Sequence, residues 1–261
     1  LGRLVSADEH GVLVRSSALG ETYGVVHIAP ATGTEPPLIP ADPDVVINQV
    51  QRVGDRLIAK CISPDQAWSL RVYGLDGALQ KTISVAELGL PAQSRLAVMG
   101  GSGDETSQRF SDFDVHSVGG NQTFRLDLET LEVKARAERT TDIDLDQIQA
   151  RSLNLKARDG ADIPVQLFQP KDRAPAFTIV YQYGNIGLPN APHLIPWAQI
   201  AMELGGAVAF VGSRGGGERG ADWRNQGTLD RNVTIHDIED AARQLQREHG
   251  LEELVLAGRS W

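Results

Sequence analysis

The chain has 261 residues, enough for one large domain or two of ordinary size, and 41% of them are hydrophobic. Its formal net charge is -9, and Lys and Arg form no cluster, which argues against a nucleic-acid partner. The single cysteine, Cys61, excludes an internal disulfide and a thiolate metal cluster. No apolar run approaches the ~18–20 residues of a membrane-spanning helix, so we expect no membrane partner.

The sequence begins at Leu1 without the basic and then apolar segments that make up a secretion signal. We expect that it starts inside a longer protein. We therefore expect a cytoplasmic location, with the periplasm as the alternative.

Residues 1–142 consist of short β-prone runs separated by turn dipeptides, with almost no helical periodicity. Hairpins are predicted from paired runs at 45–53 and 56–62, 68–75 and 79–85, and 106–112 and 122–128. Two hairpins make a unit of the ~40–50 residues expected of a four-stranded propeller blade. A β-sandwich fits the same pattern. About three blades fit here, whereas a closed propeller has ~4–8, so we expect further blades before Leu1.

Residues 143–261 alternate between strands and helices, which is typical of a sheet with crossover helices. A hairpin is predicted at 152–156 and 165–169, further strands at 177–182, 207–212 and 254–257, and helices at 194–204 and 234–249. We therefore expect an α/β domain after an all-β one.

The last residues, Gly258-Arg259-Ser260-Trp261, match the first four positions of a G-x-S-x-G elbow, a strand-to-helix turn that exposes a serine hydroxyl. The predicted strand at 254–257 provides the structural context of that motif. Ser260 is thus a candidate nucleophile, and a plain turn serine is the alternative. A nucleophilic serine needs a base, usually a histidine held by a carboxylate. All histidines lie upstream, and each fits a surface or loop position better than that of the base: His10, His27, His116, His193, His236 and His249.

Two other loops follow predicted strands. One contains Tyr-Gln-Tyr-Gly-Asn-Ile at 181–186, and the next contains Arg-Gly-Gly-Gly-Glu at 214–218. Ligand sites in open α/β sheets form beyond the carboxyl ends of the strands, so we expect both loops near Ser260. No Gly-Lys-Ser/Thr follows the three glycines, which makes a phosphate loop a poor match. The alternatives are a tight turn for the glycines and a core position for Tyr183.

Taken together, the Tyr-x-Tyr-Gly loop with Tyr183, the 214–218 loop, the helix containing Asp237 and Gly258-x-Ser260 resemble the prolyl oligopeptidase family of serine peptidases. The resemblance implies that residues 1–142 are the C-terminal blades of a β-propeller and that residues 143–261 are the first half of an α/β-hydrolase domain. It implies short peptides as substrates, because the propeller restricts access. It also implies Ser260 as the acylating nucleophile. The oxyanion hole would combine the backbone N–H of Trp261 with the hydroxyl of Tyr183.

The same resemblance implies no metal or organic cofactor, since serine acyl transfer needs none. It implies that the Asp and His of the triad come from sequence beyond Trp261, so this chain alone is expected to be inactive. Departures from the family pattern at Gln182, Asn185-Ile186, Arg259 and Trp261 leave a proline preference open. The alternatives are an isopeptidase of the same family acting on lasso-peptide macrocycles, an esterase, and a non-catalytic propeller and hydrolase scaffold. The β-rich first half disfavours the esterase.

Overall fold

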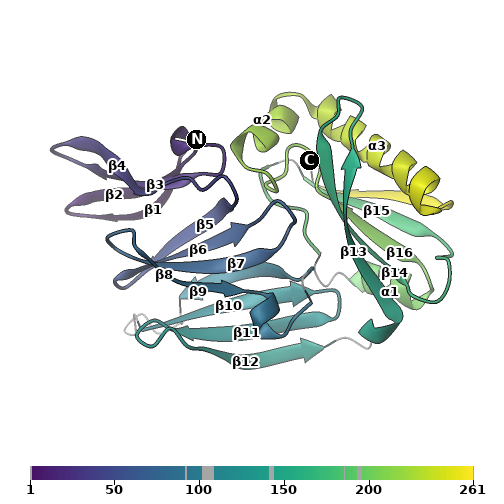
Figure 1. Ribbon diagram of the computed structural model, residues 1–261, viewed down its shortest axis with the longest axis horizontal. Helices are drawn as coiled ribbons and strands as arrows, with labels where there is room; N and C mark the ends of the chain where they lie inside the picture. Colours follow the sequence, from purple (N-terminus) through teal and green to yellow (C-terminus); the bar gives the residue numbers. More distant parts are fainter. Residues whose placement is uncertain are drawn as a thin grey trace. The chain divides into compact units, whose positions relative to one another are not determined.

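The computed structural model describes residues 2–91, 93–101, 109–140, 144–184, 186–192 and 196–260. The chain divides into two compact units (Figure 1). The first comprises Leu1–Val115 and Gln122–Glu138, and the second comprises His116–Asn121 and Arg139–Trp261.

Within the described residues, the first unit contains three four-stranded sheets, each with its strands in consecutive order. The first sheet is formed by β1 (Gly2–Asp8), β2 (Gly11–Ser16), β3 (Gly24–Ala29) and β4 (Gly33–Ile39). The second is formed by β5 (Val46–Val53), β6 (Arg56–Ile62), β7 (Trp68–Gly74) and β8 (Leu79–Ser84). The third is formed by β9 (Arg95–Gly101), β10 (Phe110–Ser117), β11 (Gly120–Asp127) and β12 (Val133–Thr140). Four consecutive strands in one sheet have the form of a propeller blade.

The second sheet has a core that covers both faces of its inner strands. Leu57 and Ile58 of β6 point to opposite faces and are 0% and 1% exposed. Polar contacts join this sheet to its neighbours, since Arg52 lies 2.8 Å from the Asp8 carboxylate and Lys60 donates to the Ala97 carbonyl at 3.0 Å. The second sheet is therefore buried on both faces and is joined to its neighbours by directed polar contacts.

The hairpins predicted around residues 54–55 and 76–77 are present as β5–β6 and β7–β8. The strand predicted at 106–112 is wrong in position. Residues 106–108 lie outside the described residues, and the strand beside β11 is β10 (Phe110–Ser117). The chain reverses directly after β10, in a turn held by the Ser117 hydroxyl. This hydroxyl accepts from Gly119 N and donates to Gly120 O, both at 3.1 Å.

The second unit is built on a five-stranded mixed sheet in the order β13-β14-β16-β15-β17. The strands are β13 (Ile148–Lys156), β14 (Asp162–Pro170), β15 (Thr178–Tyr183), β16 (Ala207–Val211) and β17 (Leu254–Arg259). The β13–β14 hairpin confirms the prediction at 152–156 and 165–169. β14 pairs antiparallel with β16, whereas β15 lies parallel to both β16 and β17.

Helices pack against both faces of this sheet. The α-helices among the described residues are α1 (Pro196–Glu203), α2 (Ala221–Leu229) and α3 (Arg231–His249), and the described 3-10 helices are Ser17–Leu19, Ala86–Leu88 and Leu145–Gln147. Ala209 of β16 belongs to a core cluster with Leu245 of α3, whereas the adjacent Phe210 belongs to a cluster with Ala198 of α1. Successive residues of one strand thus serve opposite layers.

The helices predicted at 194–204 and 234–249 correspond to α1 and α3, and α2 was not predicted. α3 begins earlier than its apolar pattern, because the Asp230 carboxylate caps it by accepting from Asn232 N at 3.0 Å. It ends at Gly250, whose φ is 65°. In the described part of the chain, no helix is both long and apolar enough to cross a membrane.

We predict that Leu245→Ala lowers the free energy of unfolding by about 2–5 kcal/mol, because Leu245 is fully buried between α3 and the sheet. Leu229, the last residue of α2, is 87% exposed, so Leu229→Ala should change it by no more than about 0.5 kcal/mol. Denaturant unfolding of the complete protein checks both values. Equal losses for the two variants would contradict the packing described.

Candidate active site

Ser260 follows directly after β17, at the carboxyl end of the sheet. β17 pairs with β15 in parallel register up to Tyr183 opposite Arg259, and Gly184 N donates to the Arg259 carbonyl at 2.9 Å. Ser260 itself is exposed and has a φ of 59°, a left-handed conformation that residues with a β-carbon rarely adopt. A sharp turn directly after a parallel strand is the geometry that the elbow motif requires.

Tyr183 is the last residue of β15 and is partly buried. A β-carbon built on the following residue, Gly184, would lie 3.9 Å from the Ser260 carbonyl oxygen. The turns after β15 and β17 are therefore neighbours, and the structure brings Tyr183 and Ser260 to the same end of the sheet. The third predicted site residue, Trp261, lies outside the described residues.

The segment 186–192, which follows β15, packs against the 213–218 loop, which follows β16. Gly187 N donates to the Gly215 carbonyl at 2.9 Å. A side chain at position 217 would collide with the Gly187 carbonyl and would come within 2.9 Å of Pro189. The two reversals thus lie in backbone contact, and glycine at 217 is what permits this approach.

Asn190 joins the same two strands from within. Its side-chain amide donates to the Tyr181 carbonyl at 2.8 Å and to the Val211 carbonyl at 2.9 Å. Its backbone N–H donates to Glu218 Oε1 at 2.7 Å. A single buried asparagine therefore uses its donors to hold the ends of β15 and β16 at a fixed separation.

Gln182 is also buried, at 3% exposure, and its amide nitrogen donates to the Gly184 carbonyl and, at 3.3 Å, to Ser213 Oγ. Gln182 is one of the positions at which the sequence departs from the family pattern. In the structure its side chain ties the turn after β15 to the loop after β16. Periodicity alone gives no signal for this contact, because it joins residues 31 positions apart.

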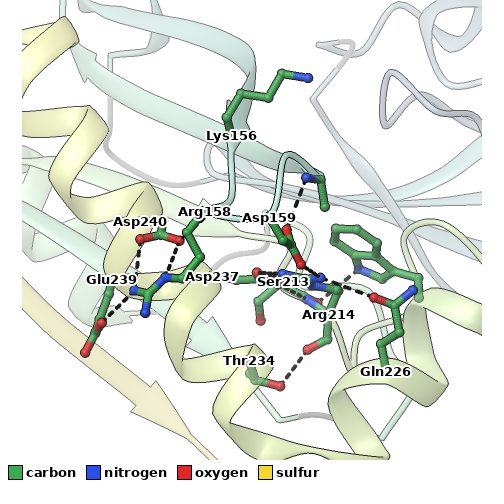
Figure 2. Close-up of polar contacts among 12 residues, drawn as sticks. Lys156, Arg158, Asp159, Ser213, Arg214, Gln226, Thr234, Asp237, Glu239 and Asp240 are labelled. Carbon is green, nitrogen blue, oxygen red and sulfur yellow. Dashed lines mark hydrogen bonds and ion pairs between the residues drawn. The ribbon is translucent and has the colours of Figure 1, made fainter.

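Arg214 anchors the 213–218 loop to α3 (Figure 2). Arg214 Nη2 lies 2.6 Å from Asp237 Oδ1, and the Arg214 backbone N–H donates to Asp237 Oδ2 at 2.8 Å. Asp159, in the β13–β14 turn, lies 2.5 Å from Arg214 Nη1, and Thr234 Oγ1 donates to the Arg214 carbonyl at 2.7 Å. The hydrogen bonds that the guanidinium donates to the Asp237 carboxylate raise the pKa of Arg214 further above its ordinary value, so this side chain is a permanent buried cation.

Among the described residues, no side chain, and therefore no histidine, hydrogen-bonds with the Ser260 hydroxyl. None of the described histidines is fully buried, which agrees with the predicted surface positions: His10 is exposed, and the others are partly exposed on regular elements, namely His27 in β3, His116 in β10, and His236 and His249 in α3. His193 falls outside the described residues. Within the same described ranges, no group of three His, Cys, Asp or Glu side chains is placed to hold a metal ion.

No protein-family model matches the chain. In sequence, it is 29% identical over 162 residues to the uncharacterized peptidase y4nA of Sinorhizobium fredii, an alignment that covers 60% of this chain and 22% of that protein. It is 33% identical over 110 residues to the prolyl endopeptidase of Elizabethkingia meningoseptica, which covers 39% of this chain and 15% of that protein.

Among solved structures, one from a study of two prolyl endopeptidases matches 98% of this chain and 38% of its own, with a TM-score of 0.86 and 20% identity. Prolyl oligopeptidase B from Galerina marginata, bound to a 25mer macrocyclization substrate, matches 99% of this chain and 36% of its own, with a TM-score of 0.79 and 19% identity. This chain resembles the prolyl oligopeptidases in both sequence and fold.

The likeness to the prolyl oligopeptidases confirms the family resemblance read from the motifs. The β-rich first unit matches the prolyl oligopeptidase propeller, which favours the propeller over the sandwich. This chain spans 15–22% of the length of the two curated peptidases and 36–38% of the two solved neighbours.

We predict that Asp237→Asn lowers the free energy of unfolding by about 3–5 kcal/mol, because it leaves the Arg214 cation buried without its main counter-charge. The matched change is Glu239→Gln, which removes a carboxylate 2.9 Å from Arg158 that is 43% exposed. An exposed pair contributes about 0–1 kcal/mol, so this control should be nearly silent. Denaturant unfolding separates the two, and a silent Asp237→Asn would contradict the anchoring role of Arg214.

Proposed function

We propose that this chain is part of a serine peptidase that hydrolyses peptide bonds in short peptides through an acyl-enzyme on Ser260. The observation that carries the proposal is the register of β15 and β17, which ends with Tyr183 opposite Arg259, the residue before Ser260. A nucleophile and an oxyanion donor have to reach the same carbonyl group. Their attachment to adjacent parallel strands supports that geometry.

In the proposed reaction, Ser260 Oγ attacks the peptide carbonyl carbon and its proton passes to a histidine. The oxyanion accepts hydrogen bonds from the Tyr183 hydroxyl and the Trp261 backbone N–H. Collapse breaks the C–N bond, the histidine protonates the leaving amine, and water then hydrolyses the ester. We propose that the Asp and His of the triad are encoded beyond Trp261, so that this chain alone is inactive.

We also propose that residues 143–261 form the first half of an α/β-hydrolase domain and residues 1–142 the C-terminal blades of its propeller. The mixed sheet with helices on both faces supports the first assignment. So does the surface of β17, the edge strand of the described sheet, where Val255 and Leu256 are 51% and 60% exposed. Further elements of a hydrolase domain would cover these apolar side chains.

The substrate class follows from the same proposal. The Galerina marginata neighbour was solved with a macrocyclization substrate, so we keep as the alternative an isopeptidase of the same family that acts on lasso-peptide macrocycles. An isopeptidase would share the acyl-enzyme step, whereas a non-catalytic scaffold would form no acyl-enzyme. Reaction at Ser260 therefore separates the enzyme from the scaffold, and a substrate panel separates the two enzymes.

We predict that a fluorophosphonate labels the complete protein at Ser260, because an activated serine attacks phosphorus as it attacks a carbonyl. Peptide mapping by mass spectrometry locates the label. Ser260→Ala and heat-unfolded protein serve as controls and should take none. Native protein that stays unlabelled while a known serine hydrolase reacts would contradict the proposal.

We predict that Tyr183→Phe lowers kcat of the complete enzyme by about 10²–10³-fold, because it removes one donor to the oxyanion. The thermal unfolding midpoint should change little, since the ring remains. Tyr73→Phe, which removes a tyrosine hydroxyl from β7 of the first unit, is the matched control and should leave kcat unchanged. A kcat for Tyr183→Phe equal to that of the parent enzyme would remove Tyr183 from the oxyanion hole.

A further inference from the structure

Glu218 is a buried carboxyl group that the proposed chemistry does not use. It is 1% exposed and lies at the end of the 213–218 loop. Gly212, which follows β16, approaches it so closely that a β-carbon there would lie 2.8 Å from Glu218 Cγ. Among the described residues, Glu218 has no ion-pair partner. A buried carboxyl group without a counter-charge is costly to maintain, so its position calls for a physical reason.

The contacts of Glu218 lead to the segment that carries Tyr183. Its Oε1 accepts the backbone N–H of Asn190 at 2.7 Å, and the Asn190 side chain in turn donates to the Tyr181 carbonyl at 2.8 Å. Tyr181 and Tyr183 lie on the same strand, two residues apart. Glu218 therefore fixes a residue that is bonded directly to the end of β15.

The surroundings favour the neutral form of this carboxyl. Burial raises the pKa of Glu218 to about 7, and the hydrogen bond from Asn190 only partly opposes this. Arg219, the next residue, lowers the pKa. Arg214 of the same loop is neutralised by Asp237, and Arg224 of α2 packs against Gly187 in the facing segment. The indole of Trp223 also lowers the pKa, but its Nε1–H donates to the Ser213 carbonyl at 3.1 Å. In the described part of the chain, Glu218 Oε2 has no hydrogen-bond partner, so a charge there would be poorly stabilised.

We propose that Glu218 is a positioning residue that, through Asn190, fixes the segment after β15 and thereby the placement of the Tyr183 hydroxyl. This inference rests on the proposed peptidase function. Glu218 acts without touching substrate, because its hydrogen bond is to the Asn190 backbone. A displacement of about 1 Å at a reacting group can cost up to about 10²-fold in rate, so a side chain in this position has leverage on turnover.

The first test compares Glu218→Gln with Glu218→Asp in the complete enzyme. Glutamine keeps an oxygen acceptor at the same reach, so its kcat should stay within about threefold of the parent value. Aspartate withdraws the acceptor from Asn190 by one methylene, and kcat should fall about 10–100-fold while KM changes less than about threefold. Glu252→Gln, at an exposed position after α3, is the matched control and should change neither constant.

The second readout is the ratio of kcat for Glu218→Gln to kcat for the parent enzyme across pH 5 to 9. A carboxyl group whose pKa is raised in the folded state stabilises the fold fully only below its pKa in the unfolded state, about 4.3. This stabilisation is lost as the pH rises through the pKa of the folded state. Glutamine cannot ionise, whereas ionised Glu218 accepts more strongly from the Asn190 N–H and carries a buried charge without a counter-charge, so the ratio should change through about pH 7. The ratio cancels the titration of the catalytic histidine, which both enzymes share.

Retained kcat in Glu218→Asp, with correct folding by circular dichroism, would overturn the inference. So would a ratio that does not change with pH. If Glu218→Asp does not fold, the ratio from Glu218→Gln still decides the question. Failure of the proposed function would be visible separately, as parent enzyme that takes no fluorophosphonate at Ser260.

Discussion

Gly217 lies so close to the carbonyl of Gly187 that no side chain fits at position 217, and the packing of the two loops beside Tyr183 depends on this contact. The close approach lets the reversal after β15 pack against the reversal after β16, where Gly187 N donates a hydrogen bond to the Gly215 carbonyl at 2.9 Å. With β15 also paired to β17, the turn that carries Ser260 is held in the same frame. The candidate site is thus fixed by backbone contacts among three strand ends.

Buried polar side chains stabilise this frame. Asn190 satisfies two backbone carbonyls, Arg214 is neutralised by Asp237, and Glu218 accepts a backbone N–H. Each group would be costly to bury alone, so removing one partner leaves the other unsatisfied. Such groups add little net stability compared with apolar packing, but they specify one arrangement of the loops. A site that needs a tyrosine hydroxyl and a serine at defined separation benefits from that specificity.

The sequence was sufficient to place Ser260, Tyr183 and the 214–218 loop at one end of the sheet, because parallel strands bring their carboxyl ends together. It also predicted the β-rich first half and the approximate positions of α1 and α3. It did not predict α2, whose sequence, Ala-Asp-Trp-Arg-Asn-Gln-Gly-Thr-Leu, lacks a continuous apolar stripe. The strand expected at 106–112 was wrong in position. The turn held by the Ser117 hydroxyl sets the end of β10 at Ser117, five residues later than predicted. The role of Glu218 depends on burial by residues distant in sequence, and a glutamate after three glycines reads equally well as a solvated loop residue.

The proposed mechanism requires Tyr183 and Ser260 to act on the same carbonyl group. A crystal structure of the complete protein with a phosphonate bound covalently to Ser260 tests it most directly, because the phosphoryl oxygen stands for the oxyanion. We expect that oxygen to lie about 2.7–3.1 Å from the Tyr183 hydroxyl, with the Trp261 backbone N–H as its second donor. A phosphoryl oxygen directed away from Tyr183 and bound by other donors would contradict the account.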